Sequence, residues 1–199
     1  MLDDQEEMLK FASFLPLDLL NQLRISSERT GCSTTDLIEK ALILAHEAGC
    51  IVSLDLASYN VVEANIDFLK RIIRQYKPIV FANEEEARVF TGETDPHKSL
   101  EVFAALCDTA IVKTGAEGSL IYHEGEKYKA DAIRVNCLDT TGAGDLYASG
   151  YLYGYINGMK PDKCGMIGSL LAGKVIEEAG AKIRNEVWDN IRELINKGV

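Results

Sequence analysis

Residues 139–145, with the sequence DTTGAGD, combine the residue types needed to hold a phosphate group and to accept a proton. Gly142 and Gly144 allow the backbone to turn sharply and to expose consecutive N–H groups, which together can form an anion-binding cradle. A helix is predicted from about Gly144 to Asn157, and the partial positive charge at its N-terminus would strengthen the cradle. Backbone dipoles could therefore stabilise a transferring phosphoryl group without a cluster of basic side chains.

Asp145 lies in the first turn of this predicted helix, where the helix dipole favours an ionised carboxylate. Next to a phosphate cradle, such a carboxylate can accept the proton of an attacking hydroxyl group. A simpler alternative is that Asp145 is only a helix N-cap and that the glycines only form a tight turn. Because the whole motif lies between a predicted strand and a predicted helix, we predict that Asp145 is the catalytic base.

The elements that must position this motif follow an alternating pattern. From about Asp36 onward, helical periodicity alternates with short runs of β-branched residues, which is typical of a three-layer α/β/α fold with a mostly parallel sheet. Strands are predicted at residues 50–55, 79–82, 110–113, 119–122 and 127–135, the last two forming a hairpin. Helices are predicted at residues 37 to about 49, 61–76, 84–90, 97–106, 144–157, 162–179 and 185–197. The fold class is therefore α/β.

Two further groups of polar and small residues follow predicted strands. Asn83 comes directly after the strand at 79–82, and Glu86 follows in a spacing that is also typical of a helix capping box. Residues 113–118, with the sequence KTGAEG, continue the strand at 110–113 and, taken alone, are explained by an ordinary glycine turn. Each group has a structural explanation of its own, so their meaning depends on the order in which they occur.

In that order, the three motifs resemble those of the ribokinase-like (PfkB) family of carbohydrate and nucleoside kinases. DTTGAGD followed by LYASGYLYGY resembles the second signature of the family, Asn83 to Glu86 resembles its N-x-x-E motif, and residues 113–118 resemble its T-G-x-x-G nucleotide loop. The resemblance implies a ribokinase-like fold and an ATP-dependent phosphotransferase. Such an enzyme transfers the γ-phosphate to a hydroxyl group of a sugar or nucleoside, in the manner of ribokinase or adenosine kinase.

The resemblance also assigns roles to individual residues around the nucleotide. Asp145 would be the catalytic base. The backbone that holds the phosphates would come from Gly142, Ala143 and Gly144. The nucleotide would be contacted by Thr114, Gly115 and Gly118.

Two kinds of cation are implied in the same way. Asn83 and Glu86 would organise the water shell of Mg²⁺, which binds mainly through the phosphates. A monovalent cation, for which K⁺ is a candidate, would lie against carbonyl groups and the side chains of Asp139 and Thr141. The expected cofactors are therefore ATP and Mg²⁺, with K⁺ as the candidate for the monovalent cation.

Other residues are assigned to structure rather than to chemistry. Asp55, Ser58 and Asn60 could face a substrate, but turn formation before the next helix explains them more simply. Several glycines in the last predicted helices are expected to permit close helix packing, with space for adenine as the alternative. They are Gly150, Gly154, Gly165, Gly168 and Gly173.

The resemblance covers roughly residues 36–197 and lacks the family's N-terminal half, with its first glycine-rich signature and its lid. We therefore expect an atypical helical segment at residues 1–36 and a nucleotide-binding part at 37–199. We also expect either a homodimer or association through an exposed sheet edge. A short helix is predicted after Pro16. A weak similarity to ribbon-helix-helix DNA-binding modules runs from Ser13 to Ile38.

Composition limits the classes of partner. The 31 acidic and 21 basic side chains give a formal charge of -10, which argues against nucleic acid. The five cysteines form no CxxC pair, and the three histidines show no metal-ligand spacing. No apolar run is long enough for a membrane span and the first residues are acidic, so we expect a cytoplasmic protein.

Two alternatives to an active kinase remain open. The chain could be a non-catalytic nucleotide-binding remnant, which keeps the cradle but cannot orient an acceptor. It could also combine a DNA-binding or dimerising N-terminal module with an inert kinase fragment.

Overall fold

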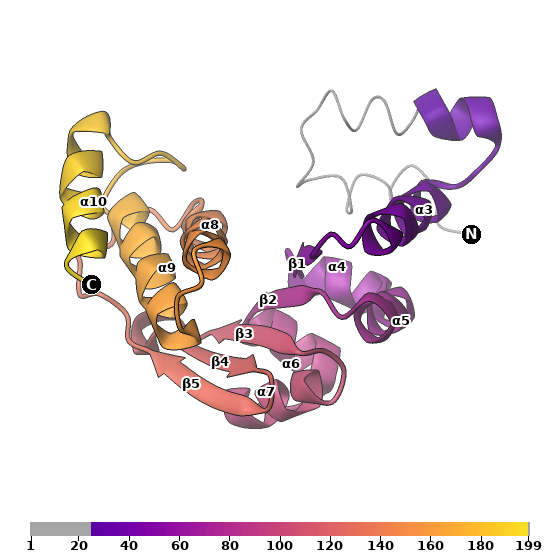
Figure 1. Ribbon diagram of the computed structural model, residues 1–199, viewed down its shortest axis with the longest axis horizontal. Helices are drawn as coiled ribbons and strands as arrows, with labels where there is room; N and C mark the ends of the chain where they lie inside the picture. The colour runs from indigo at the N-terminus through magenta and orange to yellow at the C-terminus, as the bar shows by residue number, and fades with distance from the viewer. Residues whose placement is uncertain (1–24, 199) are drawn as a thin grey trace.

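The computed structural model describes residues 25–198, and its centre is a five-stranded mixed sheet (Figure 1). The strands lie side by side in chain order, with β1 to β3 parallel and with β4 and β5 added antiparallel. Their bounds are β1 (Ser53–Asp55), β2 (Ile79–Asn83), β3 (Thr109–Lys113), β4 (Ser119–His123) and β5 (Glu126–Ala130). The carboxyl ends of three neighbouring parallel strands therefore meet at one edge.

Helices cover both faces of this sheet (Figure 1). One face is covered by α4 (Tyr59–Ala64), α5 (Ile66–Tyr76), α6 (Glu84–Thr91) and α7 (Pro96–Ala104). The other is covered by α8 (Ala143–Ile156) and α9 (Pro161–Ile176), with α10 (Trp188–Asn196) packed on α9. Further helices are α3 (Thr34–Glu47) and the 3-10 turns η2 (Gly115–Glu117) and η3 (Asn185–Val187). The predicted α/β layers are confirmed.

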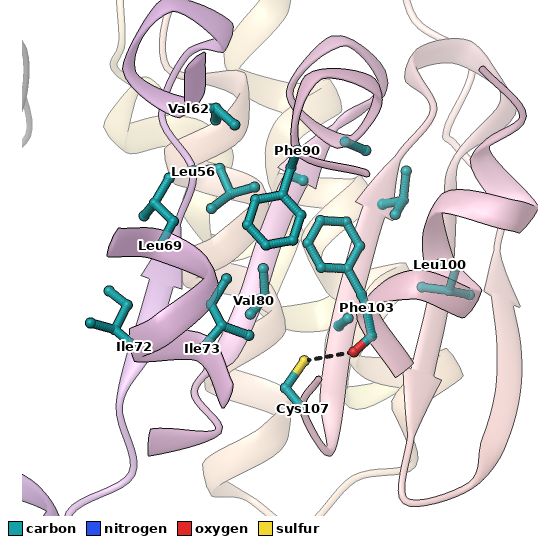
Figure 2. Packing of buried hydrophobic residues seen from close by; sticks show 14 of the residues in the cluster. Leu56, Val62, Leu69, Ile72, Ile73, Val80, Phe90, Leu100, Phe103 and Cys107 are labelled. Atoms are coloured by element: carbon teal, nitrogen blue, oxygen red, sulfur yellow. Dashed lines mark hydrogen bonds between the residues drawn. The ribbon is translucent and has the colours of Figure 1, made fainter. Parts of the chain in front are cut away.

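Alternate residues of β2 supply the two halves of the core. Val80 and Ala82 face α4–α7, whereas Ile79 and Phe81 face α8 and α9. In the first half, the rings of Phe90 and Phe103 stack with their centroids 4.9 Å apart (Figure 2). Because both faces of the strand are buried, it reads in the sequence as a continuous apolar run.

Glycines bring α8 and α9 into close contact. A Cβ atom added to Gly150 would lie 2.8 Å from the carbonyl oxygen of Ile167, and one added to Gly154 would lie 2.9 Å from Sγ of Cys164. Such separations exclude any larger residue without movement of a helix backbone. The expected close helix packing is confirmed at both positions.

The helix predicted at 162–179 ends at Ile176, and the one predicted at 185–197 starts as the 3-10 turn η3. Three further predicted elements differ from those observed. The second strand of the hairpin ends at Ala130, because the chain then leaves the sheet and Ile133 packs against Gly173 of α9. The predicted helix 61–76 is interrupted at Asn65, whose backbone is not helical and whose side chain donates to the carbonyl of Val61. The first strand is also shorter, starting at Ser53.

The structure describes only part of the N-terminal segment for which predictions were made. Residues 25–30 are helical and precede α3, which ends at Glu47 with Ala48 as its C-cap. Gly49 follows in the left-handed conformation, which is common directly after a helix. The helix expected after Pro16 and the first part of the ribbon-helix-helix similarity lie outside the described residues. Within residues 25–198, no helix has both the length and the hydropathy to cross a lipid bilayer.

Candidate functional site

The site is built where the parallel strands end. Asp55, Asn83 and Lys113 are the last residues of β1, β2 and β3, and Asn83 and Lys113 are partners in the β2–β3 register. Open α/β sheets bind ligands outside the carboxyl ends of their strands. The sheet therefore presents two opposite charges and an amide at the edge where a ligand is expected.

The DTTGAGD loop leads into the N-terminus of α8. Gly142 is the N-cap and has φ of 79°, in the left-handed region, and a Cβ atom there would lie 2.6 Å from Cβ of Ala181. No side chain of the described residues caps this helix. The N–H of Ala143 donates to the carbonyl of Thr140 at 3.1 Å, so the N–H groups of Gly144 and Asp145 are those left for a ligand or for water.

Asp145 lies exposed in the first turn of α8. It is the third helical residue, whereas Gly142 is the N-cap, so the simpler explanation of Asp145 as an N-cap is wrong. An ionised carboxylate at this position lies next to the uncapped N–H groups and benefits from the helix dipole. Its role as catalytic base stays a prediction.

Asp139 stabilises the loop that precedes α8 through hydrogen bonds. Its Oδ1 accepts hydrogen bonds from the backbone N–H of Thr141 at 2.9 Å and from the Thr141 hydroxyl at 2.7 Å. Its Oδ2 accepts from the N–H of Gly180 at 2.8 Å, in the loop between α9 and α10. These bonds, with that of the Thr141 hydroxyl the strongest contribution, lower the pKa of Asp139. These bonds account for both side chains, and their contact with a monovalent cation stays a prediction.

Asn83 and Glu86 form a reciprocal capping box at the start of α6. The Asn83 side chain accepts from the N–H of Glu86 at 2.9 Å, while Glu86 accepts from the Asn83 backbone and side chain, each at 2.7 Å. Glu86 is only 3% exposed, and burial raises its pKa against the opposing effects of the Asn83 backbone hydrogen bond and the Lys113 charge. The structural alternative is thus observed. Each carboxylate oxygen keeps a further lone pair, which fits contact with Mg²⁺ through water but not a closed metal site.

Lys113 and Asp55 form an ion pair that the sequence did not assign to the site. Nζ of Lys113 lies 3.0 Å from Oδ2 of Asp55, so the side chain crosses the end of β2, which separates their strands. The same nitrogen lies 3.3 Å from the position of a Cβ atom on Gly144. The ammonium group therefore stands next to the first turn of α8. Asp55 also accepts from the N–H of Ala57 at 2.9 Å, which is the turn role predicted for it.

The segment Thr114–Gly118 forms a tight loop between β3 and β4. The N–H of Thr114 donates to the carbonyl of Gly118 at 2.8 Å, around η2. Gly118 has φ of 92°, and a Cβ atom there would lie 2.0 Å from the carbonyl oxygen of Ala130. Only glycine fits this position. The contact of Thr114, Gly115 and Gly118 with a nucleotide stays a prediction.

A cavity of about 380 Å³ lies elsewhere, at the end of α9. None of the predicted site residues lines it. Its walls carry the ion pairs Lys174–Glu177 and Arg184–Glu178, with nitrogen–oxygen distances of 2.9 and 2.6 Å. The described part of the chain also holds no group of three or more His, Cys, Asp or Glu residues arranged for a metal ion.

The chain is similar to known proteins in sequence and in fold. A nucleoside kinase from Methanocaldococcus jannaschii is 37% identical over 91 residues, which are 45% of this chain and 30% of that protein. Its solved structure, described as an archaeal member of the ribokinase family, has a TM-score of 0.62 at 28% identity and covers 74% of this chain and 48% of that chain. The α/β fold is therefore ribokinase-like.

Two further relatives extend the similarity. A 5-dehydro-2-deoxygluconokinase from Bacillus licheniformis is 28% identical over 167 residues, covering 80% of this chain and 51% of the relative. The adenosine kinase from Sinorhizobium meliloti has a TM-score of 0.76 at 32% identity, covering 82% of this chain and 50% of that chain. This chain thus spans about half of these relatives, or less.

A family model described as "pfkB family carbohydrate kinase" matches residues 23–188. The match includes the DTTGAGD loop, the capping box of α6 and the loop between β3 and β4. Since it extends over most of the sequence, the chain belongs to the pfkB family of carbohydrate kinases.

Proposed function

We propose that this chain provides the phosphate-binding and catalytic part of an ATP-dependent kinase that phosphorylates a hydroxyl group of a sugar or nucleoside. One observation carries the proposal: the N-terminus of α8 has no capping side chain, and Asp145 lies exposed in its first turn. A helix N-terminus of this kind stabilises phosphate oxygens, and the adjacent carboxylate can accept the acceptor's proton.

The phosphoryl transfer follows from these positions. The backbone of Gly142, Ala143 and Gly144 would hold the transferring group, while Asp145 takes the proton from the attacking hydroxyl as the new oxygen–phosphorus bond forms. Because the transition state is loose, the position of the carboxylate matters more than its basicity. The leaving ADP would be held through the loop that contains Thr114, Gly115 and Gly118.

Magnesium fits at the carboxyl end of β2 only through water. Bound with the nucleotide, Mg²⁺ would neutralise charge on the phosphates. Asn83 and Glu86 would fix its water shell from α6, with Glu86 kept in place by its two hydrogen bonds to Asn83. Those bonds orient the carboxylate whether or not a metal is present.

The acceptor is proposed only as a class. The relatives named above act on a nucleoside, on adenosine and on a deoxygluconate derivative. All three offer a hydroxyl group on a polar ring or chain. An adenosine-like nucleoside is the first acceptor to test, because the adenosine kinase covers 82% of this chain.

A second candidate is a nucleotide-binding protein without turnover. Such a protein would keep the uncapped N-terminus of α8 but would not orient an acceptor. Two chains could associate through β1, because β1 is a three-residue strand at the edge of the sheet and the neighbouring Ile51 is exposed. We propose this edge as the contact for a homodimer.

The test is a calorimetric titration of the full chain with Mg-ATP, alone and then with adenosine or ribose, followed by an assay of ADP release. Saturable binding with acceptor-dependent ADP release is the result expected of a kinase. Binding without ADP release in the presence of either acceptor would favour the second candidate. Absence of binding would overturn both.

A further inference from the structure

The ammonium group of Lys113 is largely buried, unlike that of a typical surface lysine. Its side chain is only 15% exposed, and that of its partner Asp55 is 28% exposed. The two residues lie 58 positions apart in the sequence and are joined across the end of β2. The ion pair therefore holds the ammonium group at the carboxyl end of β2, away from bulk solvent.

The surroundings of this cation are partly positive. The N-terminus of α8 carries a partial positive charge, and Nζ of Lys113 lies 3.3 Å from the Cβ position of Gly144 in its first turn. Carboxylates also belong to these surroundings, since the charge of Lys113 acts on Glu86 and Asp145 lies in the same first turn of α8. The ammonium group and the uncapped helix N-terminus both attract negative charge, so an anionic ligand at the first turn would interact with both.

Hydrogen-bonding capacity is also left over. An ammonium group has three N–H donors. Within the described residues, Nζ of Lys113 donates one hydrogen bond, to Asp55. The donors that remain can reach an anion at the first turn of α8 while the bond to Asp55 is kept.

We propose that Lys113 binds the terminal phosphoryl group of the nucleotide and that Asp55 is the positioning residue that holds the ammonium group there. This rests on the proposed kinase function and adds a charged side chain to a cradle otherwise made of backbone groups. Lys113 contributes charge at the phosphoryl group that is transferred, so its effect is greater for ATP than for ADP.

The first variant is Lys113→Met, which keeps the length of the side chain and removes its charge. The full-length variant and the wild type are titrated with Mg-ATP, Mg-ADP and adenosine. We expect ATP affinity to fall by about tenfold to a hundredfold, the range for a hydrogen bond to a charged group. ADP affinity should fall less, and adenosine affinity should stay unchanged. Lys129→Met is the matched control, because Lys129 is an exposed lysine of β5 in an ion pair with Asp131.

Asp55→Asn removes the group that positions the ammonium but keeps the ammonium itself, so the preference for ATP over ADP should fall, and by less than in Lys113→Met. A purely structural ion pair predicts that both variants lose stability and that neither changes this preference. That second result would overturn the proposal. Since Lys113→Met leaves Asp55 without its partner, the double variant Asp55→Asn/Lys113→Met provides the measurement if the single variant does not fold.

The outcomes separate the two levels of inference. If the wild type binds Mg-ATP and Lys113→Met binds it equally well, the role of Lys113 is wrong and the kinase function stands. The same conclusion follows if ATP and ADP affinities fall by the same factor, because Lys113 would then contact an inner phosphate or act through structure. If the wild type does not bind Mg-ATP, the proposed function is wrong, and the role of Lys113 fails with it.

Discussion

Ser119 and Tyr147 are 28 residues apart in the sequence, and their hydroxyl oxygens lie 2.6 Å apart in a buried hydrogen bond. Ser119 is the first residue of β4, directly after Gly118, and Tyr147 follows Asp145 by half a turn in α8. The bond therefore joins the loop predicted to contact the nucleotide to the helix predicted to hold its phosphates. Burial raises the pKa of Tyr147, which keeps its hydroxyl protonated and able to donate.

Replacing Tyr147 by Phe should weaken both the fold and the site. It leaves the Ser119 hydroxyl buried without this partner, which costs about 1–3 kcal/mol of unfolding free energy. The loop and α8 also lose a fixed separation, so affinity for Mg-ATP should fall. Urea denaturation and calorimetric titration measure the two effects.

The matched control is Tyr153→Phe, on the exposed side of the same helix, and it should change neither quantity. The double variant Ser119→Ala/Tyr147→Phe removes both partners and should be more stable than Tyr147→Phe alone. If the double variant loses the sum of the two single losses, the hydroxyl groups do not interact and the assignment of this bond is wrong.

Replacing Gly142 by Ala should destabilise the chain through two separate effects. A non-glycine residue at φ of 79° costs about 1–2 kcal/mol. The added methyl group also collides with Ala181, whose Cβ would lie 2.6 Å away. The unfolding free energy is measured by urea denaturation.

Gly158→Ala isolates the backbone effect, because Gly158 has φ of 68° and its Cβ position has nothing within 4 Å. Gly142→Ala should lose more stability than this control, and Ala181→Gly in the same chain should restore part of the difference. Equal losses in the two single variants would show that the contact with Ala181 is not rigid.

The sequence predicts where the parallel strands end better than it predicts which side chains contact one another at those ends. The apolar run of β2 and the glycines of the loop before α8 are local signals, and both lie where they were predicted. Asp55 was assigned only to a turn, because a local pattern explains its bond to Ala57. Its pairing with Lys113 depends on the order of three strands, which no spacing in the sequence encodes.

The end of the hairpin shows a second reason why the sequence does not predict which elements pack together. Ile133 and Val135 alternate with polar residues as in a strand, and this pattern correctly indicates that one side is covered. The covering element is α9, since Ile133 contacts Gly173, and the chain here is not paired with a neighbouring strand. Alternation reports burial of one side, but it does not report the partner.

Replacing Asp145 by Asn should separate catalysis from binding. The amide has nearly the same shape and cannot accept the proton of the hydroxyl group, so turnover should fall by about 10²–10⁴-fold. Affinity for Mg-ATP should be retained, because the N–H groups of the first turn are unchanged. Acceptor-dependent ADP release and calorimetric titration measure the two quantities.

Asp189→Asn is the control, since Asp189 is also a carboxylate in the first turn of a helix, in α10. It should leave both quantities unchanged. Turnover by Asp145→Asn at the wild-type rate would remove Asp145 from the mechanism.

The hydrogen bonds of Asp139 should make the stability of the chain depend on pH. Because the bonds from Thr141 and Gly180 lower its pKa below the ordinary value of 3.8, the folded state favours the ionised carboxylate more than the unfolded state does. This contribution is fully present above the unfolded pKa and is lost as the pH falls through the lower folded pKa. Asp139→Asn should therefore be less stable than the wild type at pH 7 and should lose less stability between pH 5 and pH 3, as measured by urea denaturation at each pH.

The exposed Asp131 supplies the control Asp131→Asn, which should follow the wild-type curve. A wild-type pH dependence in Asp139→Asn would show that its carboxylate is not ionised preferentially in the folded chain.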